Sequence, residues 1–466
     1  MKKTSRAGYL AKNTFIFALG NFGTKMIAFF LVPIYTHVLN TSQYGIVDLI
    51  TTITMVLAPV IVLNINESLM RFALDKNPDM SGISSVGIVC MGGGVLVGTV
   101  IIPIAHLFPK IAPYSGFIYL YTIAYAACLV FLYGLRGKEK LLLYSIGNII
   151  LSLSTAVLNI LFLVVLKRGV EGYLTSYIIA NFITAIYAFL VGGVIKDLRH
   201  FHFDHHLAKE MIKYAIVLVP NTFMWWIMNS SDRVMVTAMI GSAANGVYAI
   251  SYKIPTLLST ISGIFTQAWG YSAIKEDESK DREEFNNKVF EGMAAAVFAS
   301  AVGMMLVIKP FLKVYVEKSY FSAWKYTPYL TIGYAFLSLA TFLATQYTVN
   351  KDSKGYLFSA SVGALLNIVL NYLMIPRLGV AGAALATCVS YIVVFLYRCI
   401  DTRKYLRLRI ITKKNVVATC IMFACAFSLF INGIVGYVAM AAELLVLLFI
   451  YRDVWGTLVK KVTHRR

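Results

Sequence analysis

Charged side chains are scarce in this sequence of 466 residues. Asp, Glu, Lys and Arg together make up 14% of the chain, whereas 59% of it is hydrophobic, and the mean hydropathy is +0.72. An average soluble domain contains about 25% charged residues, so water is not the solvent for most of this chain. The composition therefore excludes an ordinary soluble enzyme or binding domain.

Several chemical signatures are also missing. The sequence contains no Gly-x-x-x-x-Gly-Lys-Ser/Thr phosphate loop and no soluble segment long enough for an ATPase domain. We therefore expect any uphill transport to use a gradient of H⁺ or Na⁺, or the gradient of the substrate itself. The six cysteines lack the spacing of metal ligands, and the His-rich segment 200–206 is interpreted as a solvated linker. We expect no bound metal, no other cofactor and no enzymatic activity.

Long apolar runs, by contrast, recur along almost the whole chain. A helix needs about 20 apolar residues to cross the hydrocarbon core of a bilayer. Because these runs do not alternate between apolar and polar residues, they predict helices rather than a transmembrane barrel. We therefore predict an all-α integral membrane protein with about fourteen transmembrane helices. The predicted spans are 13–36, 45–66, 83–108, 114–135, 142–166, 172–195, 211–240, 246–270, 288–312, 323–348, 355–375, 378–400, 415–432 and 434–451.

Basic residues outnumber acidic ones, 42 to 22, which gives a formal net charge of +20. Lys and Arg are retained on the cytoplasmic side of a membrane protein. With the N-terminus inside, the cytoplasmic connections hold roughly four basic residues for each one on the opposite face. This bias predicts that both termini are cytoplasmic. The most basic connection, 403–414, would attract anionic membrane lipids, so the charge requires no nucleic-acid partner.

The chain resembles itself at a spacing of about 200 residues. The turn that leads into Gly45 recurs before Gly246, and the motif at 169–172 recurs at 379–382. Six helices are thus followed by six related helices. Since each unit has an even number of spans, the two repeats are parallel, which is how many transporters build two lobes around a central site.

The repeat divides the chain into three predicted parts. Residues 1–208 form an N-terminal six-helix lobe, and residues 209–405 form a second six-helix lobe. Residues 406–466 form two additional transmembrane helices and a basic cytoplasmic tail.

Few ionisable residues fall inside the predicted spans, where each costs about 2.5 to 3.5 kcal/mol unless it faces a partner or a wet cavity. The clearly intramembrane basic residues lie on equivalent helices of the two lobes, which predicts a shared cationic cavity for an anionic substrate. The predicted substrate-binding residues are Lys25, Arg233, Lys253, Asn21, Asn229 and Arg71, and the predicted coupling or structural charges are Asp48, Glu67 and Asp232.

Two of these assignments have a structural alternative. Asp232 and Arg233 are adjacent and would equally suit a fixed latch that neutralises neighbouring groups. Glu67 and Arg71 are four residues apart, a spacing that also favours an ion pair at the cytoplasmic edge of the membrane.

Together, several of these stretches resemble a known family. The sequence is similar, over essentially its full length, to the Wzx-like polysaccharide-export flippases of the multidrug/oligosaccharidyl-lipid/polysaccharide (MOP) exporter superfamily. The stretches that carry the resemblance are Leu39-Asn40-Thr41-Ser42-Gln43-Tyr44-Gly45, Pro220 with Ser231-Asp232-Arg233, Gly246-Val247-Tyr248 with Tyr252-Lys253, and Gly169-Val170-Glu171-Gly172.

The resemblance implies a V-shaped pair of six-helix lobes that work by alternating access in the bacterial plasma membrane. It implies that the substrate is an undecaprenyl-diphosphate-linked oligosaccharide, moved from the cytoplasmic to the outer leaflet for capsule or O-antigen export. Basic cavity residues, here Lys25, Arg233 and Lys253, would hold the diphosphate. A polysaccharide polymerase and the chain-length machinery are the protein partners that it implies.

Three other functions compete with this interpretation. A lipid II flippase shares the fourteen-helix plan, but this cavity has fewer arginines than that class. A cation-coupled multidrug antiporter of the same superfamily would favour acidic residues in its cavity. A membrane enzyme, such as a polysaccharide polymerase or ligase, would need a sizeable outer loop with catalytic residues, and the outer connections are too short.

Overall fold

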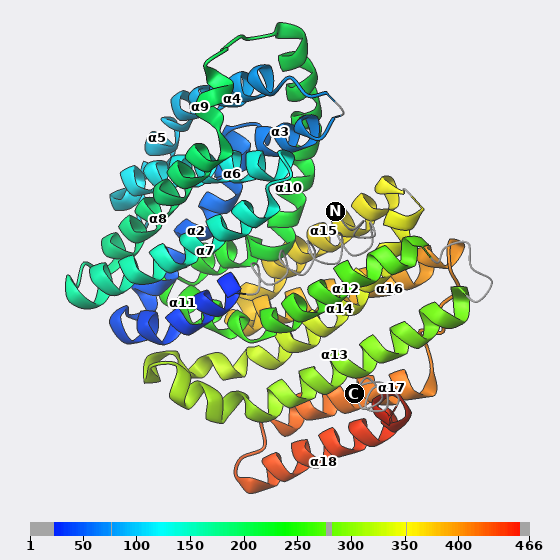
Figure 1. Ribbon diagram of the computed structural model, residues 1–466. Coiled ribbons are helices and arrows are strands. Elements are labelled where there is room, and N and C mark those ends of the chain that lie inside the picture. The colour runs from blue at the N-terminus through cyan, green and yellow to red at the C-terminus, as the bar shows by residue number, and fades with distance from the viewer. Residues whose placement is uncertain (1–22, 76, 276–281, 351, 457–466) are drawn as a thin grey trace, which may run out of the picture. The chain divides into compact units, whose positions relative to one another are not determined.

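Every regular element in the described part of the chain is a helix (Figure 1). The computed structural model describes residues 23–75, 77–275, 282–350 and 352–456. Within these ranges, ten helices are long and apolar enough to cross a membrane, and the shorter helix Ile434–Ile450 is apolar as well. The predicted all-α membrane fold is therefore confirmed, whereas the number of fourteen spans stays a prediction.

The chain divides into two compact units. Unit 1 comprises Met1–Arg233 and Gly241–Gly246, and unit 2 comprises Val234–Ile240 and Val247–Arg466. Helices α10 (His205–Met239) and α11 (Ser242–Lys253) contribute residues to both units. The predicted lobe boundaries at residues 208 and 405 remain predictions of the sequence.

Unit 1 is built around α6, which packs against α8, α3 and α2. Small residues permit these close contacts: a Cβ atom on Gly137 of α6 would lie 2.7 Å from the Cβ atom of Ala73 in α3. The helices of unit 1 after the first one (residues 23–38) are α2 (Thr41–Ile61), α3 (Ile65–Ala73), α4 (Met80–Gly98), α5 (Ile101–His106), η1 (Ala112–Tyr114), α6 (Ser115–Gly137), α7 (Leu141–Asn159), η2 (Ile160–Val165), α8 (Gly169–Gly192) and α9 (Val194–Leu198).

The predicted span 45–66 in unit 1 is broken. The run predicted at 45–66 divides into α2 and α3, because Leu63 and Asn64 both adopt a positive φ of 55°. The Asn64 amide donates a hydrogen bond to the Thr222 hydroxyl of α10, 2.9 Å away. A tertiary contact thus holds a left-handed conformation that an apolar run would not adopt alone.

Unit 2 is centred on α14 (Thr327–Val349), almost all of which is buried. This helix packs against α12, α13, α15 and α16. The other helices of unit 2 are α12 (Pro255–Lys275), α13 (Arg282–Tyr315), η3 (Lys318–Lys325), α15 (Ser353–Leu378), α16 (Val380–Asp401), η4 (Thr402–Lys404), α17 (Lys413–Ser428) and α18 (Ile434–Ile450). The hairpin of α17 and α18, drawn in orange and red in Figure 1, lies along α13.

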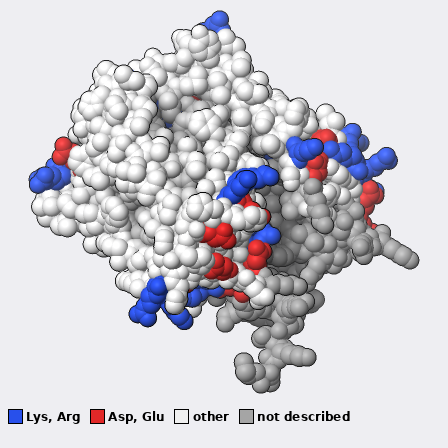
Figure 2. Space-filling view, turned by 90° about the horizontal axis from the view of Figure 1, so that it is seen from above, with Lys and Arg blue, Asp and Glu red and all other residues white. Residues whose placement is uncertain are grey.

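Charged residues occupy little of the face shown in Figure 2. In Figure 2 most of the visible face is white, and Lys, Arg, Asp and Glu side chains gather in a few clusters. A face so poor in charge suits contact with lipid tails, as the composition predicts.

Candidate functional site

The two turns that the repeat relates meet inside unit 1. Asn40 caps α2 by accepting a hydrogen bond from the backbone N–H of Gln43, 2.9 Å away. In the next turn, the hydroxyls of Ser42 and Ser242 lie 2.7 Å apart. The first turn of α2 and the first turn of α11 are therefore in direct contact.

Two glycines make this contact unusually close. A Cβ atom on Gly45 would lie 1.8 Å from the Ser242 carbonyl oxygen, and one on Gly246 would lie 2.0 Å from the Thr41 carbonyl oxygen. No side chain fits at either position without moving the backbone. These are the same two glycines that mark the repeat in the sequence.

One turn further along α2, three polar side chains form a buried cluster. The Arg233 guanidinium of α10 lies 3.2 Å from the Asp48 carboxylate, and their side chains are 20% and 9% exposed. The Asn245 amide donates to the Gly45 carbonyl oxygen at 2.9 Å and lies 3.4 Å from the other Asp48 oxygen. Asp48 therefore has two donors, and the charge of Arg233 is balanced by a residue far away in the sequence.

Asp232 and Asn229 lie on the same helix as Arg233. Asp232 is buried, and its carboxylate accepts a hydrogen bond from the backbone N–H of Arg233 at 2.9 Å. The Asn229 amide donates to the Trp225 carbonyl oxygen at 2.7 Å. The geometry favours the alternative of a fixed latch around Arg233, with Asp48 as the carboxylate that pairs with its guanidinium.

Three other predicted cavity residues do not belong to this cluster. Lys25 lies on the exposed side of the helix formed by residues 23–38. Lys253 ends α11, is half-buried and belongs to unit 2. Asn21 lies outside the described residues. The shared cationic cavity that these residues predict therefore stays a prediction.

The predicted ion pair between Glu67 and Arg71 is wrong. Arg71 points to the surface and pairs instead with Asp75, 2.7 Å away, with both side chains about half exposed. Glu67 is half-buried and lies beside Tyr133 and Arg136 of α6. Although residues four apart lie on the same side of a helix, Glu67 turns toward α6 and Arg71 reaches Asp75 in the next turn.

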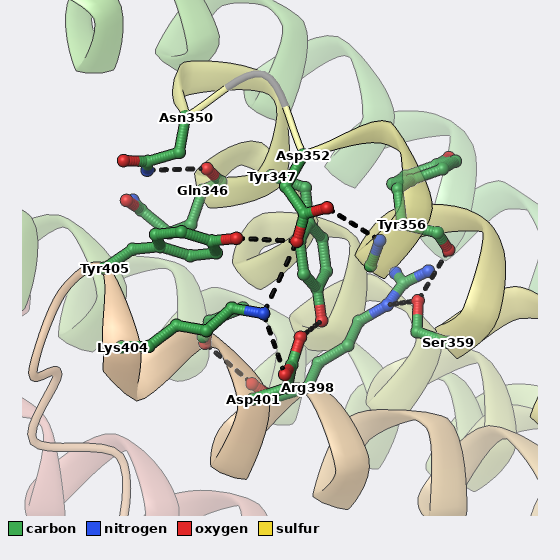
Figure 3. Close-up of polar contacts among 12 residues, drawn as sticks. Gln346, Tyr347, Asn350, Asp352, Tyr356, Ser359, Arg398, Asp401, Lys404 and Tyr405 are labelled. Carbon is green, nitrogen blue, oxygen red and sulfur yellow. Dashed lines mark hydrogen bonds and ion pairs between the residues drawn. The ribbon is translucent and has the colours of Figure 1, made fainter.

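Unit 2 contains a buried arginine that the sequence analysis did not single out. Arg398 of α16 is only 3% exposed, and its guanidinium donates to the Ser359 hydroxyl at 3.0 Å and to the Ala340 carbonyl oxygen at 2.9 Å. The guanidinium also lies over the ring of Tyr356, 5.4 Å from its centroid. Figure 3 shows Arg398 and Ser359 side by side between α15 and α16.

Next to Arg398, an ionic network joins the ends of three helices (Figure 3). The Lys404 ammonium lies 3.0 Å from Asp401 and 3.4 Å from Asp352, and the Tyr347 hydroxyl donates to Asp401 at 2.7 Å. The Tyr405 hydroxyl donates to Asp352 at 2.6 Å. Hydrogen bonds from the Tyr405 hydroxyl and then from the Gly355 backbone hold the pKa of Asp352 below its ordinary value.

A second polar cluster lies in the interior of unit 2. The Asn371 amide donates to the Asn367 side-chain oxygen at 2.9 Å, and the Asn367 amide donates to the Thr387 hydroxyl at 3.3 Å. The Tyr252 hydroxyl lies 3.4 Å from the same Thr387 oxygen. These side chains come from α15, α16 and α11, so they fasten the three helices together at a depth where water is scarce.

The His-rich linker makes no group that could hold a metal ion among the residues that the structure describes. His202 instead pairs with Asp79 at the start of α4, 2.7 Å away. The contact with the His200 carbonyl and then the hydrogen bond with Asp79 raise the pKa of His202. The linker is therefore tied to unit 1 by an exposed ion pair.

Two buried residues of these polar clusters, Arg398 and Asn245, are absent from the predicted site residues for different reasons. Arg398 lies near the end of the predicted span 378–400, and the charges predicted to lie inside the membrane do not include it. Asn245 was taken as part of a polar turn, although its equivalent position near Gly45 already indicated a repeat-related contact. The spacing of about 200 residues was the signal that would have identified the second residue.

Comparison with known proteins gives two family matches. The sequence profile described as polysaccharide biosynthesis protein matches residues 10–270, and the profile described as lipid II flippase MurJ matches residues 273–449. Among curated proteins, lipid II flippase MurJ of Thermosipho africanus (strain TCF52B) is 24% identical over 136 residues. That match covers 27% of this chain and only 29% of the length of the flippase.

Solved structures share the fold at low sequence identity. Lipid II flippase MurJ in an inward closed conformation aligns with a TM-score of 0.62 and 16% identity, over 94% of this chain and 99% of the other. An inward-facing multidrug resistance MATE family transporter of the MOP superfamily aligns with a TM-score of 0.63 and 14% identity, over 83% and 94%. The helical arrangement is thus one that the solved transporters of this superfamily share.

Proposed function

Because the chain belongs to the polysaccharide biosynthesis protein family of the MOP superfamily, we propose that it is a flippase for lipid-linked oligosaccharide. The observation that carries the proposal is the family match over residues 10–270, more than half of the chain. The substrate is an undecaprenyl-diphosphate-linked polysaccharide repeat unit, moved from the cytoplasmic to the outer leaflet of the bacterial plasma membrane. A polysaccharide polymerase and the chain-length machinery would take over the product.

The multi-pass helical fold supports this function. An amphiphile with a diphosphate headgroup cannot cross hydrocarbon unaided, because an unpaired charge there is costly. A protein with two related halves can offer a site that opens to each side in turn. Basic side chains recognise diphosphate by charge-assisted hydrogen bonds, so Lys25 and Lys253 are the residues we assign to its recognition. We assign the driving force to an H⁺ or Na⁺ gradient.

Arg233 would bind the diphosphate only after it separates from Asp48. In the described conformation Asp48 balances its charge, and a diphosphate would have to compete with that carboxylate. Asp48 would then act as an internal substitute for the anionic substrate, released when the substrate binds. Asn245, which also donates toward Asp48, would retain the freed carboxylate.

Lipid II is the second candidate substrate. The lipid II flippase profile matches residues 273–449, and the curated relative that matches part of this chain is a lipid II flippase. Both candidates are substrates of the same chemical class, a polyprenyl diphosphate that carries a glycan. They differ in the glycan, so a transport assay with both substrates separates them.

The test is transport in proteoliposomes that contain the purified full chain. Fluorescent undecaprenyl-diphosphate oligosaccharide or lipid II is placed in one leaflet, and its arrival in the other is followed by chemical quenching. We expect the wild type to flip the oligosaccharide. The rate of flipping in Lys25→Gln should be lower by about tenfold or more. The matched control is Lys167→Gln, an exposed lysine in the connection between α7 and α8. Flipping of lipid II alone would overturn the choice of substrate, and no flipping of either would overturn the function.

A further inference from the structure

We infer that unit 2 binds one anionic phospholipid at the connection between α16 and α17, which is drawn in orange in Figure 1. Exposed arginines of this connection bind the phosphate, and an apolar slot beside them takes one acyl chain. The evidence is the charge balance of the connection, the way its backbone is held, and the side chains that line the slot. The inference does not depend on what the protein transports.

The connection has more cations than carboxylates to pair with them. Lys404 and Lys414 each have two carboxylate partners, at distances of 2.9 to 3.6 Å. The other four basic side chains are exposed, and no carboxylate in the described ranges comes within 4.0 Å of them. These four side chains are Arg403, Arg407, Arg409 and Lys413. The connection therefore presents a group of cations that an anionic ligand can neutralise.

The backbone of this connection is held in a defined position. In the extended segment 406–410, Arg407 and Arg409 are exposed, whereas the two end residues of the segment are buried. Residues two apart in an extended chain point to the same side, so both guanidinium groups face away from the protein core. The backbone N–H of Arg409 donates to Asn287 Oδ1 of α13 at 2.6 Å. Little further ordering of the backbone is needed to bind a ligand here.

An apolar slot lies directly beside these arginines. It has a volume of about 90 Å³ and is enclosed by residues of α13, α14, α16 and α17. Ile410 and Ile411 of the connection also line it, and Ile411 is 74% exposed, so the slot reaches the surface next to Arg409. Deeper in the slot, the walls are aromatic side chains that are only 2% to 8% exposed: Phe290, Phe298, Phe336 and Phe395.

The polar side chains in the lining of the slot are satisfied within the protein. The Asn415 amide donates to the Ile410 carbonyl oxygen at 2.7 Å, and its Oδ1 accepts from the Tyr451 hydroxyl at 2.6 Å. The Thr419 hydroxyl donates to the Asn415 carbonyl oxygen at 2.8 Å. The slot therefore favours an apolar occupant. In a membrane protein, the apolar group at hand is the acyl chain of a lipid.

The arginines and the slot together specify an amphiphile with an anionic headgroup. A guanidinium binds phosphate through parallel, charge-assisted hydrogen bonds, which suits a phospholipid headgroup. The basic connection alone would attract any anionic surface. The slot adds a place for one acyl chain, and this distinguishes a single bound phospholipid from a diffuse layer of anionic lipids.

Native mass spectrometry of the purified full chain tests the inference. The protein in detergent is titrated with phosphatidylglycerol or with phosphatidylcholine that carries the same acyl chains. We expect one phosphatidylglycerol to be retained about tenfold more tightly than phosphatidylcholine, and Arg407→Gln/Arg409→Gln to lose most of this preference. The matched control is Lys196→Gln/Arg199→Gln, which removes two exposed charges at α9 in unit 1 and should leave the preference unchanged.

Two further measurements test the slot itself. Val416 lines the slot and is 49% exposed, so Val416→Trp blocks it from outside without disturbing the core. We expect this variant to retain phosphatidylglycerol about tenfold less tightly at unchanged thermal stability. Glycerophosphoglycerol, which is the headgroup without acyl chains, should not displace the lipid at tenfold excess.

Three results would contradict the inference. Equal retention of the two phospholipids by the wild type, or an equal loss in the control double variant, would mean that the connection has no specific site. Displacement of the lipid by glycerophosphoglycerol, or full retention in Val416→Trp, would mean that no acyl chain occupies the slot.

Discussion

At the scale of single residues, Asp48 and Arg233 form an ion pair that neutralises two charged side chains within unit 1. Each side chain satisfies the other at 3.2 Å, and Asn245 supplies a further donor. Removing one member of such a pair leaves an uncompensated charge, which costs more than removing both. The coupling between the two residues is therefore measurable.

We predict that Asp48→Asn lowers the free energy of unfolding by about 3 kcal/mol, because Arg233 is left without its carboxylate. The double variant Asp48→Asn/Arg233→Gln should recover most of that loss. Denaturant unfolding of the purified protein in detergent measures both. Arg233→Gln alone completes the set. If the effects of Asp48→Asn and Arg233→Gln simply add in the double variant, the two residues are not coupled and Asp48 does not hold Arg233 in place.

The residue scale is also where the sequence was least informative. Asp232 is adjacent to Arg233, and this adjacency suggested that the two form a latch, yet the carboxylate that pairs with the guanidinium is Asp48. Arg398 lies near the end of its predicted span and was not among the predicted intramembrane charges, yet it is buried and its guanidinium donates to Ser359 and to the Ala340 carbonyl oxygen. Partners separated by tens or hundreds of residues cannot be read from spacing along one helix.

At the scale of elements, the spans were predicted well, because hydropathy depends only on local composition. All but one of the predicted boundaries of α6, α15 and α16 lie within two residues of those observed. The division of α2 from α3 was not predicted, since it depends on the contact between Asn64 and Thr222. The contact between the starts of α2 and α11 was predicted only as a resemblance between two turns.

That contact depends on the absence of two side chains. We predict that Gly45→Ala or Gly246→Ala destabilises the protein by about 3 kcal/mol or prevents folding, because the new methyl group would overlap a backbone carbonyl. Gly303→Ala in α13 is the control: its Cβ atom would meet nothing within 4 Å. In a helix interior, that change should be neutral or stabilising by up to about 1 kcal/mol.

Thermal unfolding of the three variants, and their yield in the membrane, checks this prediction. Equal stability of Gly45→Ala and Gly303→Ala would mean that α2 and α11 do not approach as closely as described. Such a result would leave the repeat in the sequence intact but would remove its structural explanation.

At the scale of the whole molecule, the distribution of Lys and Arg predicts how the chain is inserted. We predict that a fluorescent protein fused after residue 466 is fluorescent in cells, and that alkaline phosphatase fused there is inactive, because the excess of Lys and Arg predicts a cytoplasmic C-terminus. Phosphatase fused in the connection between α7 and α8 should be active. An active phosphatase at the C-terminus would contradict the predicted number or orientation of spans.

The close approach of Gly45 and Gly246 has a consequence for how the two repeats can change. Gly45 lies against the Ser242 carbonyl oxygen and Gly246 against the Thr41 carbonyl oxygen, and the same offset of 201 residues relates the two contacts. Equivalent residues that meet must be complementary to themselves, as in an isologous dimer. Glycine meets this condition by taking no space. The chain therefore carries, within one polypeptide, the chemical restriction of a homodimer, and each repeat limits the side chain that the other can accept at its glycine.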